Sequence, residues 1–206
     1  MKQIIFKDRI ENRKIKLAAK ILIEDGILIH PAENLYGFGA IISAQKSIAK
    51  ISTIKKRKSK KSYIVLIGNL SQLDLLVNKI SKVEKKLIDK FWPGALTIIF
   101  PAKKKFWKSP ICQNKTVAIR FVGNEITQKI INETRIPIIS TSVNISQKDE
   151  FYEVNKIIKK FENRVDGIAI DKIHKFRNLP STIVKVVDKK IMILREGAIK
   201  KIKIFG

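Results

Sequence analysis

Short apolar runs alternate along this chain with longer segments whose apolar residues recur every three or four positions. This alternation constrains the fold more than any other feature. Helical spacing marks the segments 10–25, 43–54, 71–91, 124–133 and 153–163. Runs rich in β-branched and aromatic residues predict strands at 27–29, 63–67, 96–100, 117–121, 138–141, 167–170, 183–187 and 191–194. We therefore predict an α/β fold, a twisted mixed sheet with flanking helices that is partly parallel and has an antiparallel C-terminal portion.

Nothing in the sequence divides the chain into separate units. It has no internal repeat and no low-complexity linker, so residues 1–206 are expected to form a single domain with a real core. The first helix is expected to stop at Gly26. Sheets of this kind bind ligands where strand ends meet loops, so the loops after 29, before 63, after 91 and after 141 are expected to carry the site.

The chain carries 43 lysine and arginine residues against 18 acidic residues, which gives a formal net charge of +25. This imbalance favours polyanionic partners. However, lysine greatly outnumbers arginine and is accompanied by many Ile and Asn residues, and all three residue types have A/T-rich codons. Lysines outside the clusters named below are therefore interpreted first as solvated surface.

Several classes of site are disfavoured by what the sequence lacks. Cys112 is the single cysteine, and His30 and His174 are far apart, so no metal site is expected. The sequence has no apolar run of about 18 residues and its first residues are charged, which predicts no membrane association and a cytoplasmic location. Phosphate-loop and dinucleotide fingerprints are missing, and neither histidine stands in a recognisable catalytic triad.

Two predicted loops next to strand ends have an unusual composition, one with glycines and the other with basic residues. Residues 29–40 place two glycines around an aromatic residue, which predicts a loop that needs positive φ or close backbone approach to a ligand. Residues 46–61 carry a local charge of +8 without an acidic residue. In an extended segment Lys55 and Arg57 would share one face and could hold one phosphate together. An ordinary turn and a solvated basic loop are the structural alternatives.

A third stretch, residues 140–146, is rich in hydroxyl groups just beyond a predicted strand. Ser142 and Asn144 stand two residues apart and could donate hydrogen bonds to phosphate or ribose oxygens. The alternative is that they cap the following segment.

Four further motifs follow in order, at 91–97 (FWPGALT), 116–120 (TVAIR), 181–184 (STIV) and 193–199 (ILREGAI). Taken with the loop stretches, their order and spacing resemble the threonylcarbamoyl-AMP synthase family, and most closely its short, single-domain YrdC/TsaC form. The resemblance extends over about residues 10–199. Several separated motifs in one order are more specific than any one motif alone.

The resemblance implies a YrdC-like fold with a basic concave pocket and a nucleotidyltransferase activity. The reaction joins L-threonine, bicarbonate and ATP into threonylcarbamoyl-AMP and pyrophosphate, with Mg²⁺ arriving on the ATP. The product serves N6-threonylcarbamoylation of adenosine 37 (t6A37) in tRNA, which implies downstream threonylcarbamoyl-transferase proteins as partners. The resemblance assigns threonine binding to Asn34, Arg120 and Ser181, and ATP binding to Lys55, Arg57, Thr116, Ser142, Asn144 and Arg195.

The chemistry of these side chains is consistent with that reaction. A carbamate made from threonine is labile in water, so a site that excludes solvent and aligns the carbamate with the α-phosphate can act without a protein nucleophile. Lys55 and Arg57, the expected catalytic residues, would offset charge on the triphosphate and on the leaving pyrophosphate. Arg120 could pair bidentately with the threonine carboxylate.

Two other interpretations compete with this one. The first is an RNA-binding or ribosome-assembly protein that holds RNA phosphates on a basic concave face without catalysis. The second is the carbamoyl-transferring module of hydrogenase maturation factors, which shares the fold but normally sits in a far longer chain with zinc-finger-like cysteines. Binding RNA through charge alone would not require the K-x-R pair (Lys55 and Arg57) together with the S-x-N pair (Ser142 and Asn144). Their combination therefore favours the synthase.

Overall fold

The structure is a computed structural model, and it describes residues 1–32, 35–56, 62–143, 153–174 and 179–205. The strands are β1 (Lys2–Phe6), β2 (Leu28–Pro31), β3 (Tyr36–Ile41), β4 (Ile64–Ile67), β5 (Leu96–Pro101), β6 (Cys112–Gln113), β7 (Thr116–Phe121), β8 (Ile138–Ser142), β9 (Gly167–Asp171), β10 (Thr182–Val187) and β11 (Lys190–Arg195). The helices are α1 (Asn12–Ile23), α2 (Gln45–Ile54), α3 (Leu73–Leu76), α4 (Lys82–Phe91), α5 (Glu125–Thr134), α6 (Val154–Phe161) and α7 (Lys201–Phe205), with short 3-10 helices η1 (Leu70–Gln72) and η2 (Lys104–Phe106).

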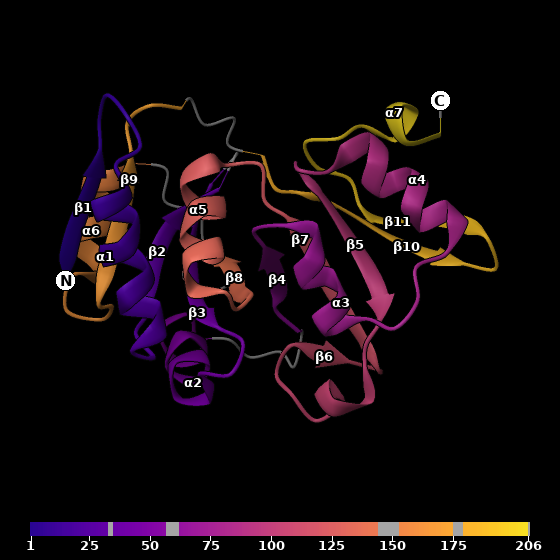
Figure 1. Ribbon diagram of the computed structural model, residues 1–206, viewed down its shortest axis with the longest axis horizontal. Coiled ribbons are helices and arrows are strands. Elements are labelled where there is room, and N and C mark those ends of the chain that lie inside the picture. The colour runs from indigo at the N-terminus through magenta and orange to yellow at the C-terminus, as the bar shows by residue number, and fades with distance from the viewer. Residues whose placement is uncertain (33–34, 57–61, 144–152, 175–178, 206) are drawn as a thin grey trace.

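All of these strands join one continuous mixed sheet (Figure 1). The strand order is β1-β9-β2-β3-β8-β4-β7-β5-β10-β11, and β6 adds to β7 beside this path. β9 runs parallel to both β1 and β2, β4 runs parallel to β7, and β5 runs parallel to β10. The other pairs are antiparallel, including the β10–β11 hairpin near the C-terminus. The predicted mixed sheet with its antiparallel C-terminal portion is therefore confirmed.

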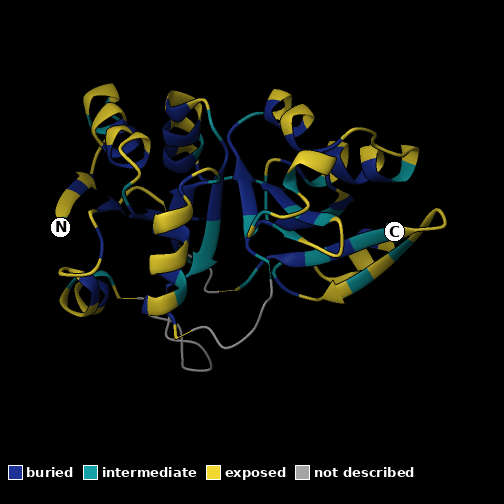
Figure 2. Ribbon diagram, turned by 90° about the horizontal axis from the view of Figure 1, so that it is seen from below, coloured by how far each residue is buried: buried dark blue, intermediate teal, exposed yellow. Residues whose placement is uncertain are grey.

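Helices cover both faces of the sheet. α1, α3, α4 and α5 lie along one face and α6 lies on the other, with the buried strands between the two layers (Figures 1 and 2). Phe161 of α6 packs edge-on against Phe38 of β3, with ring centroids 5.0 Å apart. Both side chains are fully buried, and burying an aromatic side chain of this size contributes about 2 kcal/mol or more. None of the described helices is long and apolar enough to cross a bilayer.

The stretch 29–40 is predicted to be a loop, and for residues 36–40 this prediction is wrong, because they belong to strand β3. Gly37 and Gly39 lie inside the fully buried strand β3, and no glycine in the described part of the chain has a positive φ. The close approach that these glycines permit is to neighbouring side chains, because a Cβ at Gly37 would lie 2.7 Å from Ser140 Oγ. The prediction failed because Y-G-F-G contains two poor strand formers, and only the neighbouring strands make glycine necessary there.

Two smaller expectations also need correction. Helix α1 ends before Gly26, and the left-handed residue after it is Asp25, with φ of 58°. Lys55 is the C-terminal cap of α2 and has helical φ and ψ, rather than belonging to an extended segment. Strands β1, β3 and β6 and helix α7 were not anticipated, whereas the other predicted strands and the helices α1, α2, α4, α5 and α6 are confirmed with shifted ends.

Candidate functional site

A cavity of about 410 Å³ opens where the central strands of the sheet meet the segment before β10 and the end of β11. Its lining includes two arginines and, among the described residues, no acidic side chain. The lining residues are Ala32, Leu35, Tyr36, Gly37, Ser62, Tyr63, Ile64, Leu66, Arg120, Ser140, Thr141, Ser142, Pro180, Ser181, Ile183, Leu194 and Arg195. Anionic groups are therefore the ligands that this cavity suits electrostatically.

One side of the cavity, which we call the arginine wall, is formed by Arg120, Ser181 and Arg195. The Arg195 guanidinium donates from Nε and Nη2 to the Ser181 carbonyl oxygen, at 3.1 and 2.9 Å, and from Nη2 to Ser181 Oγ at 3.1 Å. The Ser181 hydroxyl is in turn 2.8 Å from Thr97 Oγ1 on β5. These bonds give the arginine a defined orientation against the backbone before any ligand binds.

Close backbone packing behind Arg195 explains the R-E-G-A-I motif. A Cβ at Gly197 would lie 2.2 Å from the Pro180 carbonyl oxygen, so only glycine fits there without moving the backbone. The Gly197 N–H donates to Thr182 Oγ1 at 2.9 Å, and the Thr182 hydroxyl donates to the Ile199 carbonyl at 2.6 Å. The glycine thereby lets the end of β11 pack directly on the start of β10.

The F-W-P-G-A motif holds Arg120. This arginine lies on β7 and is buried, with 7% of its surface exposed, and its Nε donates to the Gly94 carbonyl oxygen at 2.9 Å. The Trp92 indole N–H donates to the Leu96 carbonyl at 2.7 Å, which closes the same turn on itself. This bond to a backbone carbonyl fixes the buried arginine beside the cavity that it lines.

Another part of the lining, which we call the hydroxyl wall, consists of Ser140, Thr141 and Ser142 on β8. The nearly buried ammonium group of Lys55 donates to the Ser142 carbonyl oxygen at 2.6 Å and lies 5.9 Å from the centre of the Phe38 ring. The end of α2 is thus bonded to the end of β8. The two residues that make this bond, Lys55 and Ser142, are the first members of the K-x-R pair and of the S-x-N pair.

Two titratable groups beside the hydroxyl wall stay neutral. Burial lowers the pKa of His30 to about 4, and the positive charge of Arg120 acts in the same direction. Burial raises the pKa of Tyr36 to about 12, and its hydroxyl oxygen accepts a hydrogen bond from the Asp171 N–H at 3.1 Å. Charge at this site therefore comes from the lysine and the arginines.

The structure brings together five of the residues named from the sequence. Arg120, Ser142, Ser181 and Arg195 line the cavity, and Lys55 contacts it through Ser142. Thr116 is not brought there, because it begins β7, its hydroxyl donates to the Gln113 carbonyl at 2.8 Å, and it is not among the lining residues. Asn34, Arg57 and Asn144 lie outside the described residues.

The cavity also contains residues that the motifs alone did not single out as ligands, namely Tyr36, Tyr63, Ser140 and Thr141. Ser140 and Thr141 stood in the hydroxyl-rich stretch, so their chemistry was visible, but their orientation depends on β8 lying between β3 and β4. In the described part of the chain, no group of three or more His, Cys, Asp and Glu side chains lies together to hold a metal ion.

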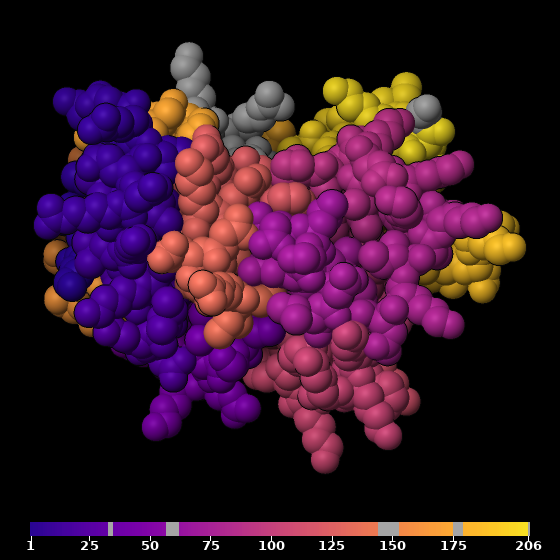
Figure 3. Space-filling view, in the orientation of Figure 1, coloured from indigo at the N-terminus to yellow at the C-terminus, as the bar shows by residue number. Residues whose placement is uncertain are grey.

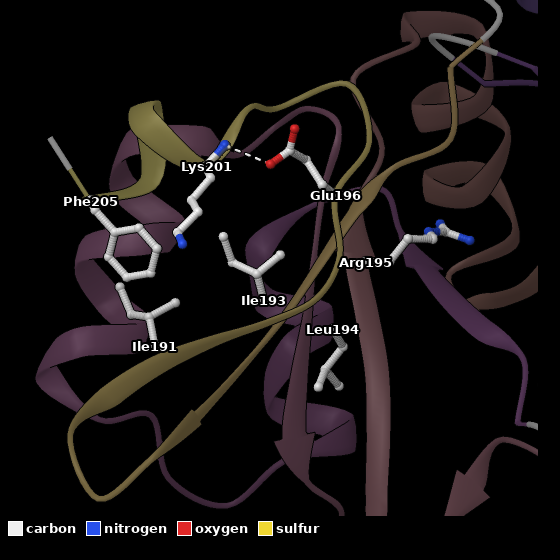
Figure 4. A pocket seen from close by; sticks show the side chains of 7 residues that line it. All are labelled: Ile191, Ile193, Leu194, Arg195, Glu196, Lys201 and Phe205. Atoms are coloured by element: carbon white, nitrogen blue, oxygen red, sulfur yellow. Dashed lines mark hydrogen bonds between the residues drawn. The ribbon is translucent and has the colours of Figure 1, made fainter.

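A second cavity, of about 430 Å³, lies between β11 and α7 (Figure 4). Ile191, Ile193 and Phe205 face one another across it, whereas Arg195 points away from it. Within its lining, the Lys201 backbone N–H donates to Glu196 Oε2 at 3.3 Å. This cavity is similar in volume but lacks convergent polar groups, so we assign the functional site to the cavity lined by the arginine and hydroxyl walls.

The fold and site define a mixed α/β protein with a cation-lined cavity that suits an anionic ligand. The Sua5/YciO/YrdC family, described as telomere recombination, matches residues 20–197. The chain therefore belongs to this family.

Individual relatives agree with this assignment. Threonylcarbamoyl-AMP synthase of Bacillus subtilis is 32% identical over 91% of this chain and 54% of its own length, and the protein of the same name from Coxiella burnetii is 29% identical over 76% and 84%. The crystal structure of P. abyssi Sua5 complexed with L-threonine is 28% identical, with a TM-score of 0.88 over 96% of this chain and 58% of that one. The chain spans about half the length of the Bacillus subtilis and P. abyssi relatives.

Proposed function

We propose that this chain, acting as a single domain in the cytoplasm, makes threonylcarbamoyl-AMP and pyrophosphate from L-threonine, bicarbonate and ATP. The product would serve t6A37 modification of tRNA through separate threonylcarbamoyl-transferase proteins. One observation carries the proposal: Lys55, Arg120 and Arg195, with the Ser142 and Ser181 groups, converge on one cavity in a chain of this family. The names of the relatives support the same reaction.

The proposed reaction has two steps. The threonine amine attacks bicarbonate and water is lost, which leaves a carbamate. A carbamate oxygen then attacks the α-phosphorus of ATP, and a P–O bond forms as the bond to the β-phosphate breaks and pyrophosphate leaves. The cavity acts by positioning both partners and by keeping water from the labile carbamate.

Each wall has a proposed part in this reaction. Arg120 pairs with the threonine carboxylate beside Ser181, in a geometry that its bond to Gly94 prepares. Lys55 and Arg195, together with Ser142, offset charge on the triphosphate and on the pyrophosphate, to which Mg²⁺ arrives already bound. The roles of Asn34, Arg57, Asn144 and Thr116 stay predictions from the resemblance.

Pyrophosphate release tests the proposal directly. We expect release that requires ATP, L-threonine and bicarbonate together, and a quenched reaction that contains a product with the mass of threonylcarbamoyl-AMP. Lys55→Ala should lower the rate, whereas Arg164→Ala, which removes an exposed arginine far from the cavity, should not. Pyrophosphate release that continues without threonine, or no release with all three substrates, would contradict the proposal.

A second candidate function, RNA binding, is favoured by one segment. Residues 102–115 contain Lys103, Lys104, Lys105, Lys108 and Lys115 and no acidic residue, and they project from the lower edge of the molecule (Figure 3). The described ion pairs lie on other elements, at 11–24, 85–89, 125–129, 153–156, 171–174 and 196–200. Trp107 is 41% exposed, with Lys115 Nζ 4.6 Å from its ring centre, which offers a stacking surface within a cationic one.

Salt dependence separates this candidate from the first. We propose that tRNA contacts residues 102–115, so replacing Lys104, Lys105 and Lys108 by alanine should weaken tRNA binding and reduce the slope of log affinity against log salt by about 2. Replacing Lys156, Lys159 and Lys160 of α6 is the matched control with the same loss of charge. Equal losses in both triple variants would show a general charge effect and contradict the proposed contact.

A further inference from the structure

A buried histidine lies behind the hydroxyl wall, and the proposed mechanism gives it no part. His30 of β2 is fully buried, and its Nε2 is 3.1 Å from Ser140 Oγ on β8. The two residues are 110 positions apart in the chain and belong to strands that do not pair, because β3 lies between them. The imidazole therefore reaches across a whole strand to contact a residue that lines the cavity.

Two glycines make this contact possible. His30 lies opposite Gly37 in the β2–β3 pair, and Gly39 lies opposite Ser140 in the β3–β8 pair. A Cβ at Gly37 would lie 3.0 Å from His30 Nε2, and a Cβ at Gly39 would lie 2.9 Å from His30 Cδ2. Strand β3 thus leaves a slot for the imidazole ring where any other residue would place a side chain.

The hydrogen bonds of the ring determine which nitrogen carries the proton. His30 Nδ1 is 3.2 Å from the Pro31 carbonyl oxygen, which can only accept, so Nδ1 must be the protonated nitrogen. The same carbonyl accepts a hydrogen bond from the buried Thr127 hydroxyl of α5. In a neutral ring Nε2 then has no proton, and the Ser140 hydroxyl must donate to it.

Burial supports the neutral state, since it holds the pKa of the His30 ring at about 4, with Arg120 of β7 as the nearby cation that also lowers it. A ring with so low a pKa is a poor proton acceptor near neutral pH. His30 is therefore unsuited to general-base catalysis. Its remaining effect is on the direction of the Ser140 O–H bond.

We propose that His30 is a positioning residue that holds the Ser140 hydroxyl proton away from the cavity and so turns the oxygen of Ser140 into an acceptor for an N–H group of the substrate. Identification of this donor as the amine or carbamate N–H of L-threonine rests on the proposed function. The cationic side chains that line the same cavity can only donate, so such an acceptor discriminates which end of an amino acid faces the hydroxyl wall.

Nitrogen NMR tests the tautomer on the unaltered chain. The sequence has only two histidines, so a protein labelled with ¹⁵N in its histidine rings gives two ring systems, which His174→Gln assigns. At pH 7 we expect His30 as the neutral ring with its proton on Nδ1. A doubly protonated His30 ring, or a proton on its Nε2, would overturn the proposal.

A double-mutant cycle tests the action through Ser140. Ser140→Ala and His30→Leu should each raise KM for threonine about tenfold, as expected for one lost hydrogen bond to a charged group, and leave KM for ATP within about twofold. His30→Gln, which keeps an acceptor near the Nε2 position, should restore most of the affinity. In the Ser140→Ala background, His30→Leu should have no further effect on KM for threonine.

The outcomes distinguish this inference from the proposed function. An effect of His30→Leu that is the same with and without Ser140 would mean that the histidine acts only on the fold, and would overturn the inference. Ser43→Ala, which removes an exposed hydroxyl, is the matched control for Ser140→Ala. Unaltered protein that binds no threonine would refute the proposed function and the identity of the donor, while the NMR result still decides the orientation of Ser140.

Discussion

The two walls of the cavity are built in different ways. In the arginine wall, charged side chains donate to backbone carbonyls, as Arg120 does to Gly94 and Arg195 does to Ser181. In the hydroxyl wall, Ser140 is oriented by another side chain, the imidazole of His30, and the carbonyl of Ser142 is bonded by the ammonium group of Lys55. The lining arginines are thus held by backbone carbonyls, whereas the lining hydroxyl of Ser140 is held by a side chain from another strand.

The two kinds of contact should respond differently to substitution. A contact to a backbone carbonyl can move only if the strand moves, whereas a hydroxyl can rotate about one bond. Substitutions behind the arginine wall should therefore cost stability, and substitutions behind the hydroxyl wall should mainly change orientation and substrate affinity. The four predictions below test this contrast, in order of decreasing effect.

Arg120→Ala should have the largest effect. The loss of a buried, hydrogen-bonded charge, proposed to pair with the carboxylate of threonine, should lower kcat/KM for threonine about a thousandfold, which corresponds to about 4 kcal/mol. Pyrophosphate release at varied threonine measures it, with Arg164→Ala as control. An unchanged KM for threonine would remove Arg120 from the threonine site.

Gly197→Ala should destabilise the arginine wall itself. The new Cβ would lie 2.2 Å from the Pro180 carbonyl oxygen, and both groups are backbone, so relief requires the start of β10 and the end of β11 to separate. We expect a loss of about 3 kcal/mol in the free energy of unfolding, measured by urea denaturation. A loss below that of Gly37→Ala would contradict the contrast between the walls.

Lower pH should destabilise the hydroxyl wall through His30. Its pKa is lowered to about 4 in the folded chain, below the ordinary value of 6.5, so the unfolded chain binds the proton first as pH falls. Stability should therefore decrease from pH 7.5 to pH 5, by about 2 kcal/mol from this group. His30→Gln should remove that part of the pH dependence in urea denaturation, and an identical slope in both proteins would refute the assignment.

Gly37→Ala should have the smallest effect on stability. Its Cβ would lie 2.7 Å from Ser140 Oγ, which can rotate away, and 3.0 Å from His30 Nε2, so the ring must shift by a few tenths of an ångström. The cost should be about 1 kcal/mol. The rotation breaks the bond between Ser140 and His30, so KM for threonine should rise severalfold while KM for ATP stays unchanged. Equal changes in both constants would indicate a general distortion of the cavity.

Local pattern was enough to predict most elements. The pattern of apolar residues within each segment was enough to predict strands β5 and β7 and helices α2 and α5. The structure confirms all four elements. Strand β3 could not be predicted from its own residues. Its two glycines are needed only because the His30 ring of the neighbouring strand occupies the space where side chains would lie. Strand β1 was missed among charged residues, and it is stabilised by parallel pairing with β9, far along the chain.

The residues of the site could likewise be predicted only in part from the sequence. Arg120, Ser181 and Arg195 were named from motifs, and the structure places them in one cavity because β7, β10 and β11 belong to the same end of the sheet. Thr116 was named from the same resemblance but begins β7, four residues before Arg120, which puts it about 13 Å farther along an extended strand. A sequence motif identifies side chains that occur together, but it does not give the distance between them along an extended strand.

Local sequence patterns were sufficient to predict the α/β class, most of the helices and strands, and the supply of hydroxyl, lysine and arginine groups near strand ends, because these depend on interactions between residues close in the chain. The strand order, the slot for His30 and the separation of Thr116 from the cavity are visible only in the folded chain. Those features arise from contacts between strands many residues apart, whose pairing depends on the packing of the whole sheet.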